Sequence, residues 1–164
     1  LHDLSLSSLR NVERGSPHEY AAIRWILEHT GPEDQVIQAT GQSYQWTTSR
    51  VAAFTGRATL LGWAGHERQW RGKDYGDMAV GREAALAGLY APDLAGSDGR
   101  LRELLEIWDV DYLFVGPWER KRYSVTPEHE AALDNTLQRV FASGEGADRV
   151  VVYAGKARTE WVEP

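Results

Sequence analysis

The sequence predicts an α/β domain of three layers, Rossmann-like, with a mainly parallel sheet. Short apolar segments alternate with segments of helical periodicity, which is typical of a parallel sheet with helices on its faces. The length of 164 residues fits one domain, and 42% hydrophobic with 26% charged residues is ordinary for a globular chain. Two closing strands joined by a tight turn predict an antiparallel hairpin at one edge.

The N-terminal part predicts a linker followed by a capped helix. Residues 1–15 have weak periodicity and are interpreted as a linker or a loosely docked segment. Ser16 and Glu19 have capping-box spacing with Pro17 between them, so a helix is expected over residues 17–30. The single domain is predicted to cover residues 16–155, and residues 156–164 form a tail.

The remaining elements follow from apolar runs and helical spacing. The parallel sheet is expected to contain strands at residues 36–39, 58–61 and 111–115, the last buried on both faces. The closing hairpin is expected at residues 137–141 and 149–153. Further helices are predicted at residues 49–55, 82–90, 99–108 and 127–135, the last capped by Thr126.

Charge and composition exclude several classes of function. With 18 Lys plus Arg and 24 Asp plus Glu, the net charge of −6 argues against a nucleic-acid-binding protein, despite a small basic patch at Arg68, Arg71 and Lys73. The absence of cysteine excludes disulfides and thiolate chemistry. No apolar run approaches the roughly 18–20 residues that span a bilayer. Because the chain begins with Leu, we expect it to be part of a larger protein.

Three segments rich in glycine, aromatic and polar residues follow the predicted parallel strands. They cover residues 40–44, 62–75 and 116–123, and each is interpreted as a loop. In open α/β sheets, ligands bind outside the carboxyl ends of the strands, where such loops meet. The sequence therefore predicts a site at this edge of the sheet.

The segment 62–72 contains the main candidate ligand-binding residues. Two tryptophans in one predicted loop suit the binding of sugars, phosphates or planar rings when polar side chains stand beside them. The alternative is a well-packed loop whose tryptophans cover the end of the sheet and whose charges pair internally. His66 and Glu67 begin like a zinc-protease motif, but Trp70 stands where the second histidine belongs, so no metal or cofactor is predicted.

A second group of candidates follows the strand at 111–115. If the two segments meet, Glu119 is expected near Arg71 or Arg68, and Glu67 near Arg120 or Arg50. Such pairs serve either as structural clamps or as a site for phosphate and sugar hydroxyls. No catalytic residue follows from spacing. The candidate ligand-binding residues are Arg50, Trp63, His66, Glu67, Gln69, Trp70, Arg71, Glu119, Arg120 and Tyr123.

Two blocks of this sequence carry a resemblance to a known family. Residues 49–72, and residues 109–120 with Tyr123 just after, resemble blocks of the YYY family of large bacterial and archaeal membrane proteins. The resemblance covers residues 31–153. Members of this family are polytopic and are similar to C-type glycosyltransferases, which take sugars from lipid-linked donors on the extracytoplasmic side. It implies that this chain is the soluble C-terminal domain, with residues 1–15 linking it to a preceding membrane region.

The resemblance implies an accessory role at the extracytoplasmic face of the cell membrane. The expected partners are the protein's own membrane-spanning region and a glycan or polyprenyl-phosphate sugar. The catalytic carboxylate of C-type enzymes lies between membrane spans, so this chain is expected to be inactive alone. Two alternatives stay open: a stand-alone Rossmann-like module or enzyme that binds a nucleotide or sugar nucleotide, and a purely structural cap.

Overall fold

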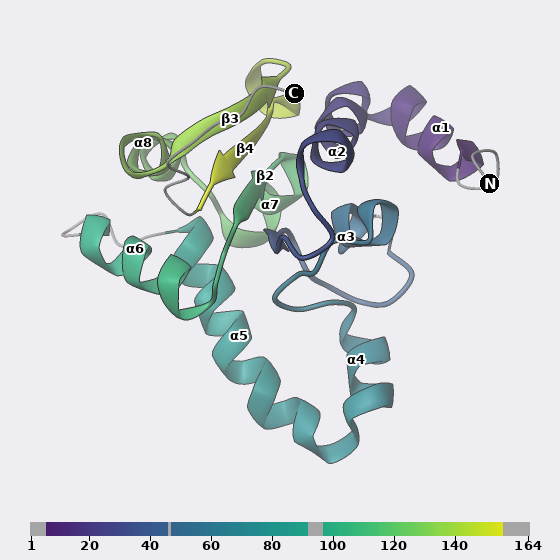
Figure 1. Cartoon of the computed structure of the whole chain (residues 1–164), viewed down its shortest axis with the longest axis vertical. Helices are drawn as coiled ribbons and strands as arrows, with labels where there is room; N and C mark the ends of the chain where they lie inside the picture. The colour runs from purple at the N-terminus through teal and green to yellow at the C-terminus, as the bar shows by residue number, and fades with distance from the viewer. Residues whose placement is uncertain (1–5, 46, 92–96, 156–164) are drawn as a thin grey trace.

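The chain folds as an α/β domain around one mixed sheet. The computed structural model describes residues 6–45, 47–91 and 97–155 (Figure 1). Within these residues four strands lie in the order β1-β2-β4-β3. Strand β1 (Val36–Ile37) is parallel to β2 (Tyr112–Val115), whereas β4 (Val150–Ala154) is antiparallel to β2 and to the edge strand β3 (Gln138–Ser143).

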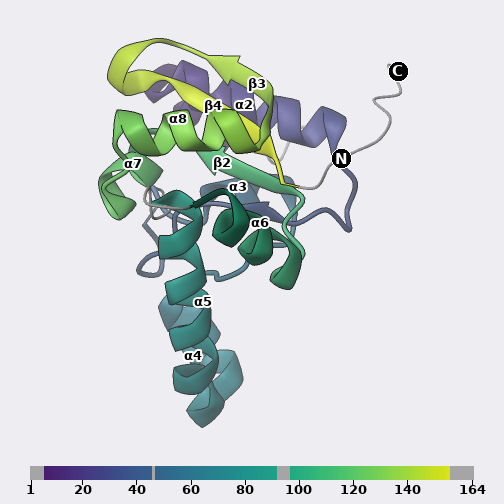
Figure 2. The ribbon, with the colours of Figure 1, turned by 90° about the vertical axis from the view of Figure 1, so that its left-hand side faces the viewer.

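The helices pack on both faces of this sheet (Figures 1 and 2). Alternate residues of β2 enter different cores, because successive side chains of a strand point to opposite faces. The helices are α1 (Leu6–Gly15), α2 (Pro17–His29), α3 (Arg50–Thr55), α4 (Ala64–Arg71), α5 (Tyr75–Tyr90), α6 (Ser97–Ile107), α7 (Pro117–Tyr123) and α8 (Pro127–Thr136), with 3-10 turns η1 (Gly72–Asp74) and η2 (Gly146–Asp148). Tyr112 and Phe114 pack with α1, α2 and α3, whereas Leu113 and Val115 pack with α5, α6 and α8.

The sequence-based expectation for the sheet is confirmed in part. Strand β2 is buried on both faces, and β3 with β4 forms the expected antiparallel hairpin at one edge. The strand predicted at residues 58–61 does not form, and Ala58 makes only an isolated bridge to Gln35. Leu60 and Leu61 are consecutive yet belong to the same core, which the alternation of a strand does not allow. The sheet is therefore mixed rather than mainly parallel.

The segment interpreted as a linker is helical from Leu6 onward. In α1, Leu9 and Val12 lie three residues apart on one face, and each is only 6% exposed where the helix meets α2. The expected capping box is also wrong, since the Ser16 side chain makes no cap hydrogen bond. Its backbone N–H instead donates to the Val12 carbonyl, so α2 starts directly after α1.

Two segments expected as loops are also helical. Residues 62–72 contain α4, and α5 starts at Tyr75 rather than at residue 82. Together α4 and the first half of α5 form an arm that projects from the rest of the domain (Figures 1 and 2). Residues 116–123 contain α7, which starts at Pro117. Among the described residues, no helix has the length and hydropathy needed to cross a bilayer.

Replacing a buried residue of α1 tests whether this helix belongs to the folded domain. We expect Leu9→Ala to lower the free energy of unfolding by about 2–4 kcal/mol, because a buried leucine leaves a cavity. The neighbouring exposed Arg10→Ala is the matched control and should change it by less than about 0.5 kcal/mol. Urea unfolding measures both. Equal small effects of the two substitutions would mean that α1 is an undocked linker.

Candidate functional site

The largest side chain that is fully buried in the described residues is a charged one, Arg50 at the start of α3. Its guanidinium donates to both carboxylate oxygens of Glu119, over 3.0 and 2.9 Å, and to Glu19 over 2.5 Å. A further hydrogen bond of 3.0 Å reaches the Thr47 carbonyl, and the Phe114 ring lies 5.1 Å away. Arg50 thus joins α2, α3 and α7 over the buried face of the sheet.

Glu119 is fully buried and also binds the backbone at the ends of two strands. Its Oε1 accepts from the N–H of Ala39, 2.7 Å away, just beyond β1. Its Oε2 accepts from the N–H of Gly116, 3.0 Å away, at the end of β2. The second bond also caps α7, since Gly116 is the residue before its first turn. One carboxylate therefore fixes the carboxyl ends of both parallel strands.

The pKa values of Glu19 and Arg50 are both shifted in this cluster. Burial raises the pKa of Glu19, and Arg50 opposes this only in part. Within the described residues, Oε2 of Glu19 has no hydrogen-bond partner. Burial alone would lower the pKa of Arg50, but Glu119 and Glu19 outweigh it and raise that pKa. Arg50 thus stays charged, with Glu119 as its main partner.

This cluster is a structural clamp, and the ion pairs expected between residues 62–72 and 116–123 do not form. Glu119 is held by Arg50, and Glu67 pairs with Arg71 over 2.5 Å. The reason is that α4 places Glu67 and Arg71 one helical turn apart, while α7 turns Glu119 inward. Ala64 and Arg122, from the two segments, nevertheless line the same cavity.

The arm carries a groove of about 550 Å³ along one side of α4. Because α4 is helical, side chains that are three or four positions apart share one face. The groove is lined by Gly62, Trp63, His66, Glu67, Trp70 and Arg71, and the last five are candidates predicted from the sequence. The structure thus brings together the residues of segment 62–72 that the sequence singled out, with one exception. Gln69 is exposed but does not line this groove.

An aromatic cluster fixes one end of the groove. The Trp63 indole N–H donates to the Thr48 carbonyl over 2.9 Å. The ring centroid of His66 lies 5.3 Å from that of Trp63 and 4.9 Å from that of Tyr44. His66 Nε2 also lies 3.1 Å from the Tyr44 hydroxyl. These contacts hold Trp63 and His66 in place, whereas Trp70 at the other end is 84% exposed.

The polar part of the groove is the ion pair between Glu67 and Arg71 on α4. Glu67 Oε2 accepts from Arg71, and Glu67 Oε1 accepts from the N–H of Gly62 over 3.2 Å. The Arg71 side chain is 46% exposed, so its remaining N–H groups face solvent. The groove therefore offers an exposed tryptophan face beside both donors and acceptors.

Other candidates lie elsewhere. Arg120 pairs with Glu130 over 2.5 Å and also donates to the Arg149 carbonyl, which ties α7 to α8 and the hairpin. Tyr123 stacks on Tyr90, with ring centroids 4.5 Å apart and ring planes 9° from parallel. Arg120 thus acts in packing, while Tyr123 lines a separate cavity.

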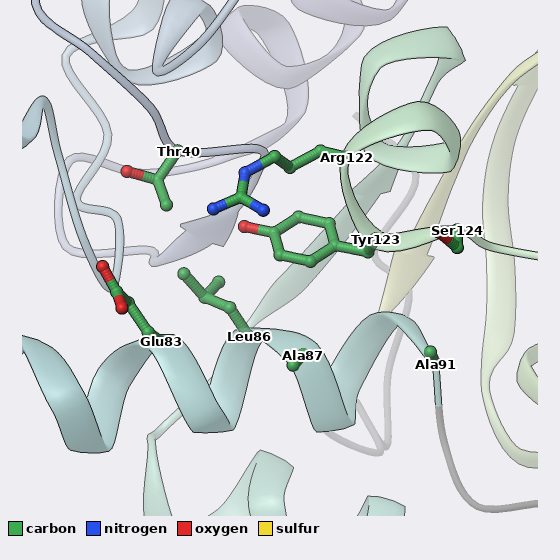
Figure 3. Close-up of a pocket in the computed structure, with 8 residues that line it drawn as sticks. All are labelled: Thr40, Glu83, Leu86, Ala87, Ala91, Arg122, Tyr123 and Ser124. Atoms are coloured by element: carbon green, nitrogen blue, oxygen red, sulfur yellow. The ribbon is translucent and has the colours of Figure 1, made fainter.

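That cavity lies at the carboxyl ends of β1 and β2, the edge of the sheet where the sequence predicted a site, but Thr40, Glu83 and Arg122 were not among the predicted residues (Figure 3). It measures about 250 Å³, and a neighbouring cavity of about 370 Å³ shares Thr40, Glu83 and Arg122 with it. We call the two together the strand-end cleft. The sequence signal for Thr40 and Arg122 was their position, because they lie in two of the three segments that were expected to meet at this edge of the sheet. Glu83 comes from α5, within a predicted helix, and had no such signal.

Comparison of this chain with protein-family models, with curated proteins and with solved structures finds no match. Within the residues that the structure describes, no group of three or more His, Asp or Glu side chains is placed to hold a metal ion.

Breaking the buried clamp tests its structural role. We expect Glu119→Gln to lower the free energy of unfolding by about 3–5 kcal/mol, because it leaves the Arg50 charge buried without its main partner. Glu103→Gln breaks the exposed Arg100–Glu103 pair and should cost less than about 1 kcal/mol. Chemical denaturation measures both. A loss as small as that of the control would contradict the clamp.

Glu19 makes the stability of the fold depend on pH. Since its pKa is raised in the folded state, its contribution is present below pH 4.5, the ordinary glutamate value, and is lost as pH rises through the folded pKa. As pH rises above 4.5, we therefore expect the free energy of unfolding to fall less in the Glu19→Gln variant than in the wild type. Exposed Glu28→Gln on the same helix is the control. Parallel pH curves for Glu19→Gln and the wild type would refute this.

Proposed function

We propose that this chain is a glycan-binding accessory domain and that the groove on α4 is its binding surface. The observation that supports this best is the groove itself, which combines Trp63, Trp70, His66, Glu67 and Arg71 on one side of a projecting helix. An exposed tryptophan face suits the apolar face of a sugar ring. The neighbouring carboxylate and guanidinium suit its hydroxyl groups.

The two tryptophans differ in how firmly they are held and how exposed they are, and this difference supports the proposal. Trp63 is held by the Thr48 carbonyl and by His66, so it forms a fixed wall. Trp70 is 84% exposed, although burying a tryptophan is strongly favourable. An exposed indole beside polar side chains suits a ligand that presents both an apolar face and hydrogen-bonding groups. In this arrangement the groove holds the sugar between a fixed wall and an open aromatic face.

We place this domain in a membrane-embedded, glycosyltransferase-like protein at the extracytoplasmic face of the cell membrane. The support is the resemblance of residues 49–72 and 109–120 to the YYY family. The proposed partners are the protein's own membrane-spanning region and a glycan or polyprenyl-phosphate sugar, and the domain is not catalytic alone. We also propose that the fold is a three-layer, Rossmann-like one, supported by helices on both faces and by the parallel β1–β2 pair.

Trp70 is the residue that tests the proposed groove. An array of glycans and soluble polyprenyl-phosphate sugar analogues is screened by thermal shift, and the hits are measured by titration calorimetry. We expect Trp70→Ala to weaken glycan binding by about tenfold, because each lost aromatic contact of this kind contributes about 1 kcal/mol or more. Its melting temperature should stay close to that of the wild type, since Trp70 is exposed.

Ile107→Ala is the matched control, because it also removes an exposed apolar side chain but lies on α6, outside the groove. Glycan affinity should be the same for this variant and the wild type. Equal glycan affinity of Trp70→Ala and Ile107→Ala would reject the groove. A large thermal shift with nucleotides and none with glycans would support the nucleotide-binding alternative instead.

A further inference from the structure

The strand-end cleft contains an arginine that has no acidic partner. Among the described residues, no carboxylate lies within ion-pair distance of Arg122, which extends from the end of α7 into the space beside Thr40 (Figure 3). The Arg122 guanidinium instead lies 5.4 Å from the centre of the Tyr123 ring. That ring stacks on Tyr90, whose hydroxyl donates to the Phe114 carbonyl over 2.9 Å. Core residues thus hold in place the Tyr123 ring, against which the Arg122 guanidinium lies.

The Tyr123 hydroxyl and residues 40–42 lie beside this arginine. In the described part of the chain the buried hydroxyl donates to no group, while the Thr40 backbone N–H approaches its oxygen. Burial raises the pKa of Tyr123 to about 12, so the hydroxyl is protonated and able to donate. Residues 40–42 form part of the wall of the cleft. Gly41 packs closely against Thr48 there, since a Cβ at Gly41 would lie only 2.7 Å from Thr48 Cγ2.

One acidic residue faces the same space from the opposite side. Glu83 on α5 lines both cavities of the cleft, as do Thr40 and Arg122. A carboxylate here repels a bare anion but accepts hydrogen bonds from hydroxyl groups. The Thr40 hydroxyl donates to the Gly62 carbonyl over 2.6 Å, so its oxygen is left as a further acceptor.

We propose that the strand-end cleft binds a phosphate ester of a hydroxylated molecule, of the sugar-phosphate class. The phosphate lies against Arg122, and the hydroxyl groups of the ligand lie against Glu83. Arginine provides several N–H donors that match phosphate oxygens. The position also agrees with the rule that ligands of open α/β sheets bind outside the carboxyl ends of parallel strands. This site is separate from the groove on α4 and does not depend on glycan binding there.

Glucose 1-phosphate, inorganic phosphate and glucose are the probes. Each is titrated into the ¹⁵N-labelled chain, and the amide signals of Gly41 and Gln42 are followed by NMR. We expect glucose 1-phosphate to shift these signals at lower concentration than inorganic phosphate, and glucose to shift them least. Binding should weaken as salt is added, since Arg122 is exposed. Equal affinity for the ester and inorganic phosphate, or no response at millimolar glucose 1-phosphate, would overturn the proposal.

Two substitutions test which side chains contact the ligand in the cleft. Arg122→Gln should weaken glucose 1-phosphate binding at least tenfold. The matched control is Arg68→Gln, because Arg68 is also an exposed arginine over a tyrosine ring, 5.2 Å from the centre of Tyr75, but lies outside the cleft. Glu83→Gln should tighten the binding of inorganic phosphate and reduce the preference for the ester. Equal effects of Arg122→Gln and Arg68→Gln would overturn the assignment, whereas Trp70→Ala tests only the glycan groove.

Discussion

The buried bond between Arg50 and Glu119 is the interaction on which the rest of the structure depends. A charged pair in the interior is tolerated when further hydrogen bonds satisfy its polar atoms, because its desolvation is unfavourable. Glu119 meets this condition with the N–H groups of Ala39 and Gly116 in addition to Arg50. Those two backbone groups follow β1 and β2, so the same bonds that satisfy the charge also set where both strands end.

Both candidate binding surfaces start from the segments that leave this clamp. After Ala39, the chain continues through Thr40 into the wall of the strand-end cleft. After Glu119, α7 continues to Arg122 and Tyr123 on the other wall. The groove on α4 lies farther out, and Trp63 connects it to this region through the Thr48 carbonyl. The positions of the candidate side chains on both surfaces therefore follow from a buried network.

Local patterns in the sequence were sufficient to predict the central strand and to single out the residues that line the groove on α4. Four apolar or aromatic residues in five positions identified the strand that became β2, because burial on both faces leaves that signature. The crowding of Trp63, His66, Glu67, Trp70 and Arg71 singled out residues that the structure brings together in one groove. Their spacing was also helical, but the glycines beside them favoured a loop interpretation. The helical arm was missed for that reason.

Tertiary contacts decided the parts that local patterns could not reach. Glu119 has three basic residues as neighbours in sequence, yet its partner Arg50 lies 69 positions away. Nothing in a single sequence identifies such a pair. The strand predicted at residues 58–61 failed similarly, since Leu60 and Leu61 both turn into one core. Glu83 reaches the cleft only because α5 passes beneath it, which depends on the packing of the whole helix.

Helix α5 has a mechanical consequence. It is 16 residues long, which corresponds to a rod of roughly 24 Å at 1.5 Å per residue. One end belongs to the projecting arm, and the other holds Tyr90 in the core, where it stacks on Tyr123. A stiff rod with its far end embedded behaves as a lever. A load applied to the arm is therefore converted into torque at the Tyr90–Tyr123 stack, beside the arginine of the cleft.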